Sequence, residues 1–270
     1  MAEITLSAGV RSNLLQLQQT ASLISTTQAK LATGKRVNSA LDNANNFFTA
    51  QGLDNRASDL NNLLDSMSSG INTIQAANNG ITAITKLVQS AQSLVSQAQQ
   101  TSDTAVRASL SSQFDAIRTQ IDQLAGDASF NGTNLLNGDD LTVTLNESGT
   151  SSTTINGVTD DANGLSITAS ANNWSGSADI TAASGDLTAA LSTLRSQSQT
   201  LSSNLSTVQI RQDFTKAMIG TLQAGSDALT LADSNQEGAN LLALQTRQQL
   251  STTALSLAAQ ADQNVLRLFG

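Results

Sequence analysis

The stretch VRSNLLQLQQTASLISTTQAKL, residues 10–31, decides the fold, because its apolar residues recur at alternating steps of four and three. A period of about 3.5 residues predicts a helix whose apolar face needs a second helix to cover it. Only Gln28 interrupts that face, whose other positions are Val10, Leu14, Leu17, Ala21, Ile24 and Leu31.

The other end of the chain carries a matching pattern. Its apolar positions are Leu250, Ala254, Leu257, Ala261, Val265 and Leu268. Because both ends need a helical partner, we expect them to pack on each other or on further copies of the chain. Such a pattern is typical of an assembly subunit rather than of an enzyme.

The composition favours long, uninterrupted helices. The chain has 270 residues and contains no proline, whose presence inside a helix costs about 3 kcal/mol. Aromatic residues make up 3% and charged residues 13%, against about 25% charged in a typical soluble domain. Hydrophobic residues make up 39% of the chain and are regularly spaced, which predicts a folded chain rather than a disordered one.

Several function classes are excluded by what the sequence lacks. The absence of cysteine and histidine excludes disulfides, thiolate nucleophiles, catalytic triads and zinc motifs. We therefore expect no enzyme, no catalytic or metal site and no cofactor. The net charge of −8 argues against nucleic acid as a partner. The sequence has no run of about 18 apolar residues that could span a membrane. Its first residues are not a basic segment followed by an apolar one, so we expect no Sec-type signal peptide.

Between the two ends the sequence predicts long helices with apolar heptads. One should follow residues 37–48, an Asn-rich segment that we expect to be an ordered loop or a broken helix. A second should start at the N-cap Asp103, and a third at the N-cap Asp186. We expect their apolar faces to form the packing of a helical rod. The residues predicted for that packing are Leu60, Leu64, Met67, Ile71, Ile74, Leu110, Phe114, Ile117, Leu191, Leu194, Leu201 and Leu205.

The middle of the chain changes to a period of two. Residues 141–145 and 165–169 alternate strictly and predict two half-buried strands in a small β-rich insert. Trp174 is expected to anchor a small core there. The acidic pairs Asp139–Asp140 and Asp160–Asp161 favour a solvated rim over a calcium site, because no DxDxDG loop accompanies them.

Several strings resemble the bacterial flagellin family, in particular its alphaproteobacterial members. They are LATGKRVNSALD at residues 31–42, FNGTNLL at 130–136, LQTRQQL at 244–250, ALSL at 254–257 and QNVLRLF at 263–269. Together the similarity covers about residues 1–138 and 187–270. Each string is short, but their order at both ends of the chain is specific.

The resemblance implies a mainly α fold, with long antiparallel coiled-coil helices from both termini and a β-rich insert in the middle. Residues 1–45 and 236–270 would be terminal arms in the inner core of a hollow filament. Residues 46–138 and 187–235 would form a helical rod domain with a β-turn, and residues 139–186 a variable outer insert. The expected filament-core interface consists of Leu6, Val10, Leu14, Leu17, Ile24, Leu31, Leu250, Leu257, Val265, Leu268 and Phe269.

The resemblance also implies a function and its partners. The chain would be a secreted, extracellular subunit that polymerises into the flagellar filament for motility. Its partners would be copies of itself, the flagellar export apparatus and export chaperone, the filament cap and the hook-associated proteins. Two alternatives remain open at this point: a junction protein between hook and filament, and a secreted coiled-coil adhesin.

Overall fold

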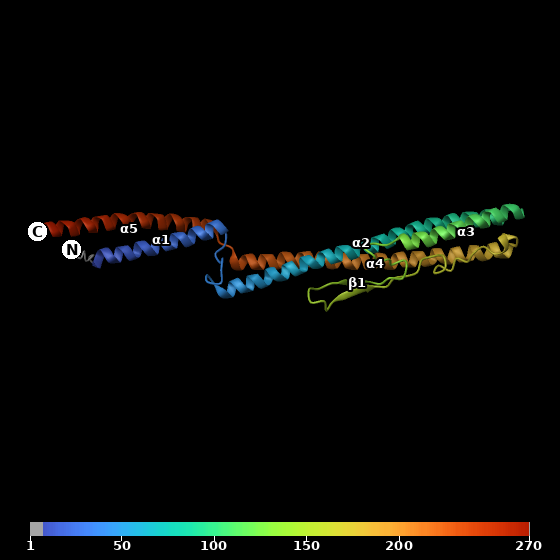
Figure 1. The fold of residues 1–270 in the computed structure, drawn as a ribbon, viewed down its shortest axis with the longest axis horizontal. Coiled ribbons are helices and arrows are strands. Elements are labelled where there is room, and N and C mark those ends of the chain that lie inside the picture. Colours follow the sequence, from blue (N-terminus) through green and yellow to red (C-terminus); the bar gives the residue numbers. More distant parts are fainter. Residues whose placement is uncertain (1–7, 270) are drawn as a thin grey trace. The chain divides into compact units, whose positions relative to one another are not determined.

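A computed structural model describes residues 8–269, and helices dominate it (Figure 1). The elements in chain order are α1 (Ala8–Thr33), α2 (Ala44–Gln100), α3 (Thr104–Asp127), β1 (Leu141–Thr144), β2 (Ser152–Ile155), the short 3-10 helix η1 (Asn172–Trp174), α4 (Ser177–Thr230) and α5 (Ser234–Phe269). The predicted fold class, mainly α with a small β insert, is confirmed. The chain divides into two compact units, residues 56–220 and residues 1–55 with 221–270.

Aspartate side chains define two of the helix starts. Asp103 Oδ1 accepts hydrogen bonds from the amides of Ala105 at 2.8 Å and Val106 at 3.3 Å, so the predicted N-cap of α3 is confirmed. Asp233 caps α5 in the same way, through the amides of Asn235 and Gln236. The caps satisfy amides that a helix leaves without an internal partner.

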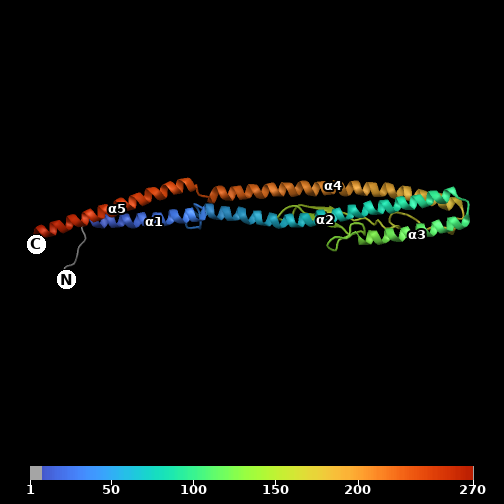
Figure 2. The same cartoon turned by 90° about the horizontal axis from the view of Figure 1, so that it is seen from above.

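The unit of residues 56–220 contains most of the helical rod, in which α2, α3 and α4 run side by side (Figures 1 and 2). Its core contains the fully buried Met67, Ile74 and Phe114. Phe114 lies against Trp174, with ring centroids 5.1 Å apart, so the prediction that Trp174 anchors a core is confirmed. Each large side chain buried there contributes about 1.5–3 kcal/mol.

The insert and the segment that leads from α3 into it pack closely on α2 at two glycines. A β-carbon added at Gly70 would lie 2.7 Å from Val143 Cγ2 of β1, and one added at Gly80 would lie 2.6 Å from Leu136 Cδ1. Any larger residue at these positions would push the insert away from the helix.

The prediction of strands is half right. Residues 141–144 form β1 as expected, but the partner strand is Ser152–Ile155, with Leu141 opposite Ile155. The predicted strand at 165–169 is wrong. Ser166 has φ of 56°, which breaks an extended chain, and the Ile167 carbonyl accepts a hydrogen bond from Arg118 Nε rather than from a strand.

Two predictions about aspartates are also wrong. Asp186 does not start a helix, because α4 already begins at Ser177; its carboxylate accepts hydrogen bonds from the Thr168 amide and hydroxyl instead. Asp160 does not belong to a solvated rim, because its side chain is fully buried. The sequence placed the Asp186 carboxylate at a helix end and the Asp160 carboxylate at the surface, whereas the first binds Thr168 and the second is buried.

Candidate assembly surface on the terminal arms

The two arms form an antiparallel helical hairpin, with α1 and α5 side by side in both views (Figures 1 and 2). Their Cα atoms come within 8 Å of each other along the hairpin. Helices approach this closely where the facing side chains are small. Here the buried Thr20 and Thr27 of α1 and the half-buried Ser251 of α5 provide that space.

The least exposed residues of each arm define the seam, the pair of rows through which α1 and α5 contact each other. They repeat at steps of three and four, as a coiled-coil seam requires. In α1 the seam consists of Val10, Asn13, Leu17, Thr20, Ile24, Thr27 and Leu31, and in α5 of Leu241, Leu244, Gln248, Ser251, Leu255 and Ala258.

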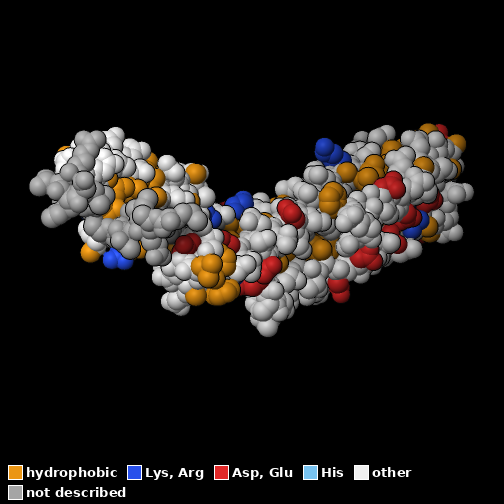
Figure 3. Space-filling view, turned by 60° about the vertical axis from the view of Figure 1, so that its left-hand side comes forward, with side chains coloured by type: hydrophobic (Ala, Val, Ile, Leu, Met, Phe, Trp, Pro, Cys, Tyr) orange, Lys and Arg blue, Asp and Glu red, His pale blue; other side chains and the backbone are white. Residues whose placement is uncertain are grey.

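A second set of apolar residues lies outside the seam, and we call it the outer row. On α5 these residues are Leu242, Leu250 and Leu257, which are 67%, 66% and 62% exposed, and on α1 they are Leu14, Leu15 and Leu23. The visible face in Figure 3 shows orange apolar side chains among white, uncharged ones. The hairpin therefore leaves large apolar side chains of both arms in contact with solvent.

The predicted filament-core residues divide between the seam and the outer row. Val10, Leu17, Ile24 and Leu31 lie in the seam, whereas Leu14, Leu250 and Leu257 lie in the outer row. Leu6 lies outside the described residues. The same is true of the side chains of Val265, Leu268 and Phe269, whose backbone continues α5.

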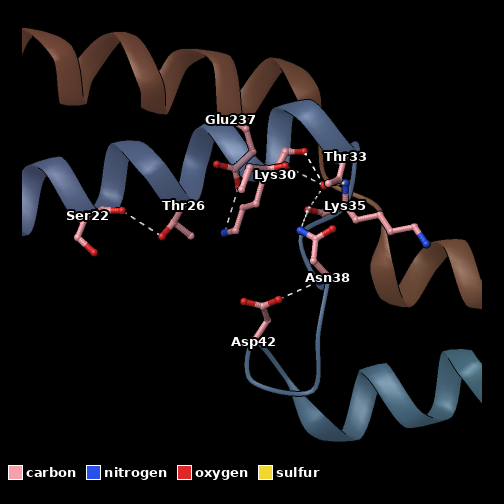
Figure 4. A network of polar contacts seen from close by, with 9 residues as sticks. Ser22, Thr26, Lys30, Thr33, Lys35, Asn38, Asp42 and Glu237 are labelled. Atoms are coloured by element: carbon pink, nitrogen blue, oxygen red, sulfur yellow. Dashed lines mark hydrogen bonds and ion pairs between the residues drawn. The ribbon is translucent and has the colours of Figure 1, made fainter.

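The segment that follows α1 makes several polar contacts beside the end of the hairpin (Figure 4). The Asp42 carboxylate accepts hydrogen bonds from the amides of Asn38 and Ser39, both at 2.9 Å, and these bonds lower its pKa. The Arg36 amide donates to the Thr230 carbonyl at 2.8 Å. These contacts fix the position at which the chain leaves α1.

An ion pair links the two arms close to this segment. Lys30 Nζ lies 3.5 Å from Glu237 Oε1 at the start of α5 (Figure 4). Both side chains are partly exposed, so the pair contributes only about 0–1 kcal/mol and serves mainly to set the register of α5 on α1.

All twelve predicted rod residues lie at the interior of their unit or at its edge. Leu64, Ile117 and Leu205 are half-buried. The other nine are buried: Leu60, Met67, Ile71, Ile74, Leu110, Phe114, Leu191, Leu194 and Leu201. The rod thus covers its own heptad faces, unlike the arms.

Known proteins similar to this chain are flagellins. The model of the bacterial flagellin N-terminal helical region matches residues 8–140. The flagellins FljK and FljN of Caulobacter vibrioides are each 32% identical to the chain, and each alignment covers 98% of both partners. This chain belongs to the bacterial flagellin family.

A solved Bacillus cereus flagellin aligns with this flagellin at a TM-score of 0.48 and 20% identity, over 57% of this chain and 88% of that one. The whole-length sequence relatives identify the chain as a structural subunit of the flagellar filament. Members of this family self-polymerise into the extracellular filament, so the arms of this flagellin are a candidate assembly surface.

Sequence reasoning missed the α5 side of the seam in this flagellin. Leu241, Leu244 and Leu255 contact α1, one residue out of phase with the predicted row of Leu250 and Leu257. The sequence does contain this second heptad of apolar residues, but the polar Gln248 and Ser251 interrupt it. The row of Leu250 and Leu257 is therefore the more regular apolar pattern.

Within residues 8–269, no three acidic side chains come together in a group that could hold a metal ion. In that same range, no helix has both the length and the apolar character needed to cross a bilayer.

Proposed function

We propose that this flagellin polymerises by packing its arms, residues 1–45 and 236–270, into the inner core of a hollow filament. The rod, residues 46–138 and 187–235, surrounds that core, and the insert, residues 139–186, lies outermost. In this arrangement the outer row contacts neighbouring subunits, because α1 and α5 cover only one face of each other.

The exposure of the outer row is the observation that carries this proposal. Leu242, Leu250 and Leu257 keep about two thirds of their surface in water in the monomer. Removing a fully exposed leucine from water contributes about 1.5–3 kcal/mol, so a row of them gives a strong drive for association. Leu6, Val265, Leu268 and Phe269 would extend the same contact to the ends of the arms.

We also propose the partners that accompany this role. The chain would leave the cell through the flagellar export apparatus with an export chaperone, and would meet the hook-associated proteins and the filament cap. It would carry out no catalysis, bind no nucleic acid and insert into no membrane. The absence of cysteine and histidine and the net charge of −8 support this view.

Seeded assembly tests the proposal. Purified monomer is mixed with short filament fragments, and the products are measured by electron microscopy. Long hollow tubes that grow with the concentration of monomer are expected. Short assemblies that stop growing would favour a hook–filament junction protein. Chains that remain monomeric and bind host surfaces would favour an adhesin.

Truncation tests the ends of the arms. Removing residues 265–270 should abolish growth from seeds and leave the rod unchanged, as measured by circular dichroism and by the fluorescence of Trp174. Undiminished growth of the truncated chain would contradict the role given to Leu268 and Phe269.

A further inference from the structure

The chain contains five Asn–Gly pairs, a dipeptide with its own chemistry. They are Asn79–Gly80, Asn131–Gly132, Asn137–Gly138, Asn156–Gly157 and Asn163–Gly164. Glycine has no side chain to shield its amide, so this amide reaches the carboxamide of the preceding asparagine more readily than that of any other residue.

The reaction needs only water. The deprotonated glycine nitrogen attacks asparagine Cγ, the Cγ–Nδ2 bond breaks, and ammonia leaves from a cyclic succinimide. Water then opens the ring at either carbonyl and gives aspartate or isoaspartate. The ring nitrogen carries no hydrogen, so any hydrogen bond that the glycine amide donates must break before the ring closes.

Four of the five glycine amides are occupied in the fold. Gly80 lies inside α2, where a helical bond holds its amide. The Gly138 amide donates to the Val158 carbonyl at 3.0 Å. The Gly157 amide donates to Asp140 Oδ1 at 2.9 Å, and the Gly164 amide to Asp161 Oδ1 at 2.6 Å. Bonds to a carboxylate are the stronger kind.

Asn131–Gly132 differs from the other four pairs. Among residues 8–269, no group accepts a hydrogen bond from the Gly132 amide. Asn131 is exposed at the tip of a two-residue turn, where φ is 49° at Asn131 and 84° at Gly132. Phe130 and Thr133 close the turn through two backbone hydrogen bonds of 2.9 and 3.0 Å.

We propose that Asn131 is a site of spontaneous deamidation and that the fold protects the other four asparagines. The product adds one negative charge to a chain of net charge −8. Isoaspartate also adds a methylene group to the main chain. A two-residue turn cannot absorb that extra length and keep both closing bonds between Phe130 and Thr133.

The test follows deamidation in the full-length monomer. The folded chain is incubated at mildly alkaline pH in water labelled with ¹⁸O, and fragment-ion mass spectrometry measures the label at each asparagine. We expect Asn131 to react about tenfold faster than Asn137, Asn156 or Asn163, since a factor of ten corresponds to about 1.4 kcal/mol, close to one hydrogen bond. Equal rates in the folded chain would overturn the proposal.

Two further measurements separate the fold from the local sequence. In concentrated urea the rates of all five sites should converge, whereas a ranking that survives unfolding would show that the fold is not the cause. Asp140→Ala removes the acceptor of the Gly157 amide and should raise the rate at Asn156 alone. Asp127→Ala, which removes the same charge from an exposed position, is the control, and an unchanged rate at Asn156 in D140A would contradict protection by that bond.

Discussion

At the scale of single residues, the insert keeps one carboxylate in an unfavourable place. Asp160 is fully buried, and neither of its carboxylate oxygens has a hydrogen-bond partner among the described residues. Burial, with a smaller contribution from the neighbouring charge of Asp161, raises the pKa of Asp160 to about 6, although the nearby Gln197 side chain acts in the opposite direction. The folded chain therefore holds a proton that the unfolded chain would release.

This gives a pH dependence with a defined sign. Between about pH 4 and 6 the folded state binds more protons at Asp160 than the unfolded state does, so the free energy of unfolding falls as the pH rises. The loss is about 3 kcal/mol, for a pKa raised from 3.8 to about 6. Asp160→Asn should remove this slope and make the rod more stable than the native chain above pH 6.

Urea denaturation followed by the fluorescence of Trp174 measures the effect at several pH values. Asp127→Asn is the control, because it removes a carboxylate from an exposed position of the same unit. The same slope in D160N as in the native chain would show that another group causes it.

At the scale of the elements, the sequence predicts the rod better than it predicts the arms. The heptad positions of Met67, Ile74 and Phe114 are all buried. These helices carry a wide apolar face, and such a face has to be covered by neighbouring helices of the same chain. The arms carry two overlapping heptads, and a pattern alone does not say which faces a partner helix in the same chain. Leu250 illustrates this, since it belongs to the more regular heptad and yet is exposed.

The insert was the least predictable part. The alternation at Leu165 and Ile167 correctly indicated burial, but these residues pack in a turn rather than in a strand. Sequence periodicity reports which side chains are buried, whereas the hydrogen-bond partners of the backbone depend on neighbours that the pattern does not contain.

The seam gives a prediction about the stability of the hairpin. Thr20 is 2% exposed, and its hydroxyl donates to the Gln16 carbonyl at 2.8 Å, which also has its ordinary helical partner. Thr20→Val should therefore leave no orphaned group and should stabilise the arms by about 1 kcal/mol through added apolar burial.

Hydrogen exchange of α1 and α5 in the monomer measures this change. Thr26→Val is the control, because Thr26 lies on the exposed side of α1 and makes a similar bond, to the Ser22 carbonyl at 3.1 Å. Slower exchange in T26V but not in T20V would contradict the assignment of the seam.

At the scale of the whole molecule, the two units should differ in stability. The rod buries large side chains such as Met67 and Phe114, whereas among the described residues of the seam only Val10, Thr20 and Thr27 are buried and the leucines are half-exposed. A pair of helices with so little apolar contact is marginal on its own. We expect α1 and α5 to exchange amide hydrogens faster than residues 60–95 of α2 in the monomer, and to become protected in the filament.

Hydrogen-exchange mass spectrometry of monomer and filament measures both states. Similar protection of arms and rod in the monomer would contradict the idea that the arms gain their stability on assembly. So would arms that remain unprotected after polymerisation.

We propose that the outer row of the arms carries the contacts between subunits. The most direct test is the rate of seeded filament growth for the double variant Leu250→Gln with Leu257→Gln, beside the control Ser256→Gln on another exposed face of α5. We expect the double variant to stay monomeric with unchanged helical content and the control to grow at the native rate. Growth of the double variant at the native rate would contradict this proposal.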